Sequence, residues 1–195
     1  MNRASLLQSS GCRSERSRWI AACELAPGRS SRILLACILL LGAGCGQRPV
    51  IEPIAADISP DASCALDGML LAVHDGPKSQ LLRADGGRGY YCDTREIFGE
   101  LLDPVRRRQV IGVWFQTLDA HPWEAHADGW AAPDSVVFVV GSRRMGAMGP
   151  TLAPFVARAA AEQFVAAHGG QILRLDDVDH ALLEQLQHQG MAQLE

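Results

Sequence analysis

The sequence lacks the motifs that mark the common catalytic and metal-binding classes. It has no CxxC pair for thiol redox chemistry, no CxxCH for haem attachment, no four-ligand Cys and His set for structural zinc, and neither GxSxG nor a P-loop. His121, Glu124 and His126 do not have the zinc-protease spacing, which places two histidines four residues apart on a helix. Nothing in the residue pattern therefore favours an enzyme.

Long apolar runs are also missing. The run at residues 33–41 is nine residues long, which is too short to span a bilayer as a helix. Small residues follow it at 42–44, directly before Cys45, and arginines precede it, among them Arg13, Arg16, Arg18, Arg29 and Arg32. This order is typical of a secretory signal. Gly42 stands where bacterial lipoprotein sites usually carry leucine.

We therefore expect a leader over residues 1–44 and lipidation at Cys45. Residues 46–60 are rich in proline and small side chains without a sustained period, which is typical of a flexible segment. Residues 45–61 are predicted to be a lipid anchor and tether, and residues 62–195 the folded domain. The protein is then a periplasmic, membrane-anchored lipoprotein.

Positive charge is scarce once the leader is removed. Residues 45–195 keep 12 basic and 20 acidic side chains, a net charge of −8. Nucleic-acid binding needs a basic surface, and the one basic run, residues 106–108, is better explained as a solvated helix end or turn. We therefore expect no nucleic-acid partner.

Cysteine is scarce too. Three of the six cysteines, Cys12, Cys23 and Cys37, lie in the leader, and Cys45 is the predicted lipidation site. Only Cys64 and Cys92 remain in the domain. In an oxidising compartment they either form one structural disulfide or stay as two free thiols, and the count alone does not decide between these states.

The periodicity of apolar residues predicts an α+β domain. Asp93 and Glu96 form a capping-box pattern before a helix that Pro104 ends, and a second helix begins at Thr151 and ends at residues 168–170. The expected strands are residues 69–73, 80–84, 90–92, 110–115, 136–140 and 171–175; residues 121–132 and 141–150 are expected to be loops, and residues 178–187, capped by Asp176 or Asp177, the last helix. Each half thus runs strands, helix, strand, which favours a duplicated small unit.

Soft metal ligands occur in two places. Cys64 and Met69 lie five residues apart in the segment CALDGM, where Gly68 lets the backbone turn. Met145 and Met148 form a second soft cluster in MGAMG. A thiolate with thioethers favours Cu(I). Core packing is the alternative explanation for both groups, and it is the commoner one for a cysteine and a methionine at the spacing of Cys64 and Met69. Any of the six histidines could complete a site.

Seven segments resemble, in order and spacing, the NosL family of lipoprotein accessory factors of nitrous-oxide reductase. They are CALDGM, DGPKSQ, YYCDTREIF, residues 123–132, VFVVGS, MGAMGPTLAPF and the stretch from AEQF to HGGQILRLDDV. Together they cover nearly all of residues 62–178. The resemblance implies one compact α+β domain built from two related ββαβ-like units. The fold is also similar to that of organomercurial lyase, a remote analogy with little bearing on function.

The resemblance further implies a Cu(I) metallochaperone that serves nitrous-oxide reductase together with a membrane transporter complex. Cys64 and Met69 match the family's cysteine and methionine, whereas Asp67 stands where many members carry the inner cysteine of CxxCxM. Met148 is the expected third ligand, and Cys92 and Met145 are possible additional ones.

The alternative is a structural or assembly lipoprotein with a disulfide between Cys64 and Cys92 and no metal role. Thiol counting under denaturing conditions separates the two hypotheses, because the disulfide leaves no reactive thiol in the domain.

Overall fold

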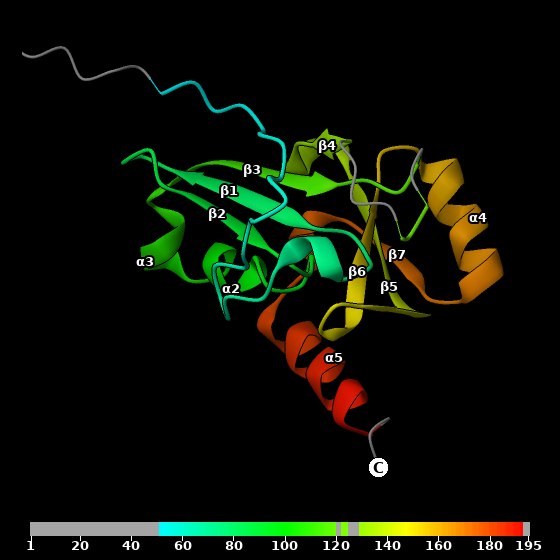
Figure 1. The fold of residues 1–195 in the computed structure, drawn as a ribbon. Helices are drawn as coiled ribbons and strands as arrows, with labels where there is room; N and C mark the ends of the chain where they lie inside the picture. The colour runs from blue at the N-terminus through cyan, green and yellow to red at the C-terminus, as the bar shows by residue number, and fades with distance from the viewer. Residues whose placement is uncertain (1–50, 120–121, 125–128, 193–195) are drawn as a thin grey trace, which may run out of the picture. The chain divides into compact units, whose positions relative to one another are not determined.

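The computed structural model describes residues 51–119, 122–124 and 129–192 (Figure 1). The predicted leader, the predicted lipidation site Cys45, and both His121 and His126 lie outside this part of the chain. No helix within the described ranges is long and apolar enough to cross a membrane.

Four antiparallel strands form the first sheet, in the order β2-β1-β3-β4. They are β1 (Ser79–Arg83), β2 (Arg88–Tyr91), β3 (Val110–Gln116) and β4 (Trp130–Ala131). The helices α2 (Phe98–Leu101) and α3 (Pro104–Arg107) connect β2 to β3. Pro104 does not simply stop a helix, as predicted, but begins α3, because the Asp103 carboxylate accepts the free N–H groups of its first turn.

Three antiparallel strands form the second sheet, in the order β6-β5-β7. They are β5 (Val137–Gly146), β6 (Gly149–Phe155) and β7 (Gln171–Leu173). Helix α4 (Arg158–His168) connects β6 to β7 and, as predicted, is followed directly by Gly169. Its φ of 77° is a left-handed conformation that glycine adopts without strain.

The two halves share one connectivity. In each half, two hairpin strands are followed by a helical connection and a third strand, which pairs with the first strand of the hairpin. The α+β class is confirmed, and the origin of the halves by duplication stays a prediction.

Three phenylalanines join the halves in one core. Phe98 of α2, Phe115 of β3 and Phe138 of β5 are fully buried, and their ring centroids are 4.9–6.0 Å apart. These separations are typical of favourable aromatic pairs. The core therefore spans both sheets.

The helix predicted from Thr151 is wrong, because residues 149–155 form β6 and α4 begins only at Arg158. The segment 141–150, predicted as a loop, instead carries β5 to Gly146 and turns at residues 147 and 148. Every residue of β6 after Gly149 is buried, and β6 contacts both α4 and α5. An apolar run that is buried throughout has no period that distinguishes strand from helix.

Three further elements differ from the prediction. Residues 130 and 131, predicted as part of a loop, form β4 and pair with β3. Residues 69–73 do not form a strand, since Leu71–Val73 is a 3-10 helix, η1. The last helix, α5, is His180–Ala192, and it follows a 3-10 helix, η3 (Leu175–Asp177). Asp179, rather than Asp176 or Asp177, caps α5 through its carboxylate, which accepts the N–H of Leu182 at 2.8 Å.

Part of the predicted tether lies against the first sheet (cyan in Figure 1). The side-chain amide of the buried Gln80 accepts the N–H of Ala56 at 3.0 Å and donates to its carbonyl at 2.8 Å. Arg88 donates to the carbonyl of Ile54 at 2.8 Å. The ordered domain therefore begins before residue 62, and residues 54–57 belong to it.

Replacing Gln80 with methionine should release this segment. Methionine has a similar size, but it has no amide group that could form the two hydrogen bonds to Ala56. We expect faster hydrogen exchange at the Ala56 amide and a loss of about 1–3 kcal/mol in the free energy of unfolding. NMR measures the hydrogen exchange of the Ala56 amide, and urea unfolding measures the free energy of unfolding. The control Gln109→Met alters an exposed glutamine and should change neither. Unchanged protection of Ala56 would show that Gln80 does not hold the segment.

Candidate metal centre

Long-range backbone pairing brings Cys64 and Cys92 together. Cys64 forms a parallel bridge with Tyr90, and Cys92 lies two residues after Tyr90, just past the end of β2. The segment after Cys64 closes on itself, since the Cys64 N–H donates to the Met69 carbonyl at 2.8 Å and the Gly68 N–H donates to the Cys64 carbonyl at 2.9 Å. Gly68 has a φ of 79°, which only glycine adopts readily. The predicted turn is thus confirmed.

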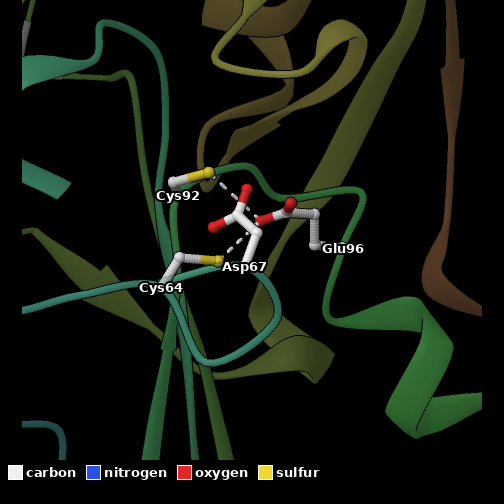
Figure 2. Close-up of side chains that lie close together, drawn as sticks. All are labelled: Cys64, Asp67, Cys92 and Glu96. Carbon is white, nitrogen blue, oxygen red and sulfur yellow. Dashed lines mark hydrogen bonds between the residues drawn. The ribbon is translucent and has the colours of Figure 1, made fainter. Parts of the chain in front are cut away.

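Four ligand atoms meet at this point (Figure 2). One atom each from Cys64, Asp67, Cys92 and Glu96 lies within 4.8 Å of the others. The sulfurs of both cysteines point toward the two carboxylates. We call this group the thiol pocket.

Glu96 is the centre of the hydrogen bonding in the thiol pocket. Its Oε2 accepts from the thiols of Cys64 and Cys92, both at 3.3 Å, and from the N–H of Asp93 at 3.2 Å. Its Oε1 is buried and has no hydrogen-bond partner within the described part of the chain. A buried polar atom without a partner is costly, so this oxygen is suited to meet a ligand.

Both thiols are held in the protonated state. Burial raises the pKa of the Cys64 thiol and of the Cys92 thiol, and the negative charge of Glu96 raises both further. Thiolate, not thiol, is the form that ligates a metal. A metal ion entering the pocket must therefore displace protons.

The predicted cysteines lie together, but they are not bonded to each other. The structure contains Cys64 and Cys92 as free, buried thiols, so the disulfide of the alternative hypothesis is not formed. The geometry instead places the two sulfurs around a shared carboxylate oxygen.

The three predicted methionines lie in different settings. Met69 is half-buried and packs against the cluster that contains both cysteines. Met148 is 38% exposed and lies in the turn between β5 and β6, next to Ala147, which packs against the same cluster. Met145 is a residue of β5, opposite Pro150 of β6. The structure brings Met69 and the Met148 turn to the thiol pocket and leaves Met145 on the strand.

Sequence reasoning missed the part that Glu96 plays. It was identified only as half of a capping box, and the bond of that motif, from the Asp93 N–H to the Glu96 carboxylate, is present. The same carboxylate also accepts both thiols. The four-residue spacing from Cys92 to Glu96 was the available signal, because residues four apart face each other when the chain turns helically. No histidine of the described ranges belongs to the pocket.

A buried lysine fixes the segment that leads from η1 into β1. The Lys78 Nζ donates to the carbonyls of His74, Asp75 and Gly76 at 2.5, 3.3 and 2.8 Å, and burial lowers its pKa. Three carbonyl acceptors compensate for the loss of water around an ammonium group. These bonds hold the backbone of residues 74–76 in place.

The donor set combines soft and hard atoms. Thiolate sulfur suits Cu(I) and zinc, whereas carboxylate oxygen suits harder cations. Cys64 and Cys92 lie close enough for one ion to contact both, and Asp67 is on an exposed loop at the edge. The arrangement can hold a metal ion and release it through its exposed side.

Comparison with known proteins agrees with this chemistry. The NosL family profile matches residues 55–183. The "Copper-binding lipoprotein NosL" of Stutzerimonas stutzeri is 34% identical over 167 residues, which cover 81% of this chain and 86% of that protein. Its counterpart of the same name in Achromobacter cycloclastes is 30% identical over 156 residues, 77% of this chain and 81% of that protein.

A solved structure is also similar. The crystal structure of the copper chaperone NosL from Shewanella denitrificans has a TM-score of 0.63 and 32% sequence identity, and the match covers 67% of this chain and 99% of that one. The relatives are named for binding copper and not for a reaction. The family profile, the sequence identity and the shared fold show that the chain belongs to the NosL family.

Proposed function

We propose that this protein is a copper chaperone that binds Cu(I) at the thiol pocket and passes it on. The observation that carries the proposal is the convergence of two free, buried thiols on one carboxylate with a buried, unpartnered oxygen. The relatives' names support copper as the cargo. The protein is a carrier rather than an enzyme.

Cys64 and Met69 are the proposed primary ligands, and Met148 the third. Met69 follows the Cys64 turn and packs against the cysteine cluster, and a thioether binds Cu(I) without losing a proton. Cys92 is the proposed additional ligand, because its sulfur lies within 4.8 Å of the Cys64 sulfur. Met145 of β5 is a further candidate ligand. Few soft ligands allow transfer by ligand exchange, in which a recipient's thiolate or thioether replaces one of them.

The proposed recipient is nitrous-oxide reductase, reached together with a membrane transporter complex. This assignment rests on the family resemblance. We further propose that Cys45 is lipidated and holds the domain at the periplasmic side of a membrane, which the name lipoprotein given to two relatives supports. The acidic domain, with a net charge of −8 without the leader, favours docking on a basic surface.

An anaerobic Cu(I) titration against a chromogenic chelator tests the proposal. The reduced chain without its leader should bind one equivalent tightly. Reduced protein that fails to compete for copper would exclude the chaperone function and leave a lipoprotein without a metal role.

The apparent Cu(I) affinity should rise with pH. Both thiol pKa values are raised in the folded protein, so both thiols are protonated between pH 6 and 8, and each thiolate that binds copper must first release a proton. We expect about tenfold tighter binding per pH unit for one thiolate, and about a hundredfold if Cys92 binds too. The titration repeated across this pH range measures the slope. An affinity independent of pH would contradict thiolate coordination.

A further inference from the structure

The turn that carries Met148 is tied to the segment that follows Cys92. Gly146 pairs with Gly149, so Ala147 and Met148 form a two-residue turn at the tip of the β5–β6 hairpin. The Met148 N–H donates to Oδ2 of Asp93 at 3.3 Å, and the Met148 carbonyl accepts from Arg95 Nη2 at 2.9 Å. Both backbone polar groups of Met148 thus bind residues from the other half of the domain.

Asp93 connects this turn to its own loop. The side chain is fully buried, and its Oδ1 accepts from the Thr151 hydroxyl at 2.6 Å and from the Arg95 N–H at 2.9 Å. Burying a carboxylate is costly unless hydrogen bonds compensate for the lost water. Here Oδ1 accepts from the Arg95 N–H and from the Thr151 hydroxyl of β6, and Oδ2 accepts from the Met148 N–H. The carboxylate therefore braces the hairpin tip against the loop after Cys92.

The backbone of the hairpin tip packs tightly against the Asp93 side chain. A Cβ at Gly146 would overlap Oδ2 of Asp93 and would lie 3.0 Å from the Cβ of Thr151. Ala147 packs against the cluster of Cys64 and Cys92. The tip of the hairpin is thus held directly beside the two thiols.

We propose that Asp93 is a positioning residue, which holds the Met148 turn at the thiol pocket so that the Met148 thioether binds the same ion as Cys64. The inference rests on the proposed function. Asp93 does not itself touch the metal. It acts through the backbone of Met148, and it makes a site in the first half depend on a hairpin of the second.

The test is a double-mutant cycle on the chain without its leader. Asp93→Asn keeps an oxygen for Thr151 but replaces the acceptor of the Met148 N–H with an amide donor, whereas Met148→Leu removes the thioether and keeps the apolar volume. Cu(I) affinity is measured for both variants and for the pair. The Met148 methyl resonance, labelled with ¹³C, is followed by NMR during copper addition.

Asp93→Asn should lose about 10-fold to 100-fold in Cu(I) affinity, the usual cost of losing a ligand's supporting contact. Met148→Leu removes the proposed ligand itself and should lose at least as much. The double variant should lose no more than Met148→Leu alone, because both changes remove the same interaction. Copper should shift the Met148 methyl resonance strongly in the wild type and weakly in Asp93→Asn.

Asp119→Asn is the matched control. The Asp119 carboxylate also accepts two backbone N–H groups, from Val156 and Ala157 at 2.7 and 2.6 Å, just past the other end of β6. Asp119→Asn should lower the free energy of unfolding without changing Cu(I) affinity. Combined with Met148→Leu, it should give the sum of the two single-variant effects on affinity and on stability.

Two results would overturn the inference while copper binding by the wild type stands. One is an unmoved Met148 methyl resonance on copper addition; the other is additive losses in Asp93→Asn and Met148→Leu. Arg95→Gln, which removes the bond to the Met148 carbonyl, decides the matter if Asp93→Asn does not fold, since it should reproduce the loss in affinity and the weak shift. A wild type that binds no copper would instead refute the proposed function.

Discussion

Cys64→Ser should abolish tight Cu(I) binding and leave the fold intact. A hydroxyl is hard, stays protonated at neutral pH and is a poor ligand for Cu(I), yet it is smaller than a thiol and can still donate to Glu96. We expect a loss of more than about 100-fold in affinity, beyond the cost of removing an outer contact. The anaerobic competition titration measures it.

Two further variants are compared with Cys64→Ser. Met69→Leu should weaken Cu(I) binding with the fold intact, because leucine fills the half-buried position but offers no sulfur. His188→Ala should change nothing, since His188 is exposed on α5. Circular dichroism and thermal unfolding confirm that each variant is folded. Tight copper retention by Cys64→Ser would refute the ligand assignment.

Phe115→Ala should have the largest effect on stability. Its ring is fully buried, and it lies 6.0 Å from the ring of Phe98 and 4.9 Å from the ring of Phe138. The truncation removes buried apolar surface and leaves a cavity between the two sheets, which costs about 3–5 kcal/mol. That is a large share of the roughly 5–15 kcal/mol that stabilises a typical domain. Urea unfolding followed by circular dichroism gives the value.

The matched control is Ile111→Ala on the same strand, β3. Ile111 is 41% exposed, so the change leaves no closed cavity, and the free energy of unfolding should fall by about 1 kcal/mol or less. Equal losses for the two variants would show that the aromatic cluster does not hold the sheets together.

Strands β1, β2, β3 and β5 could be predicted because their residues follow local rules, whereas β4 lies in a segment predicted as a loop. Segments 80–84 and 110–115 are short stretches bounded by turn residues, and they became β1 and β3. The apolar residues of β6 also fit the spacing of a helix, and the pairing of β6 with β5 is what makes this segment a strand. Local pattern carries no information about that pairing, because a fully buried run looks the same in both structures.

The candidate site also has a part that the sequence predicts and a part that it does not. Cys64, Met69 and the turn at Gly68 are adjacent in the chain, so sequence reasoning could group them. Glu96 was not recognised as part of the site, because its contact with Cys64 spans 32 residues. That contact depends on the bridge between Cys64 and Tyr90, which joins segments far apart in the sequence.

The sequence by itself determined the chemistry available to this protein: two thiols in an acidic domain, a soft-ligand turn and the pattern of its family. The tertiary structure decided how these groups meet. It placed both thiols on Glu96 and braced the Met148 turn with the buried Asp93. The physical reason is that residue type and spacing set which atoms can bind, whereas long-range strand pairing and burial set which atoms lie within reach.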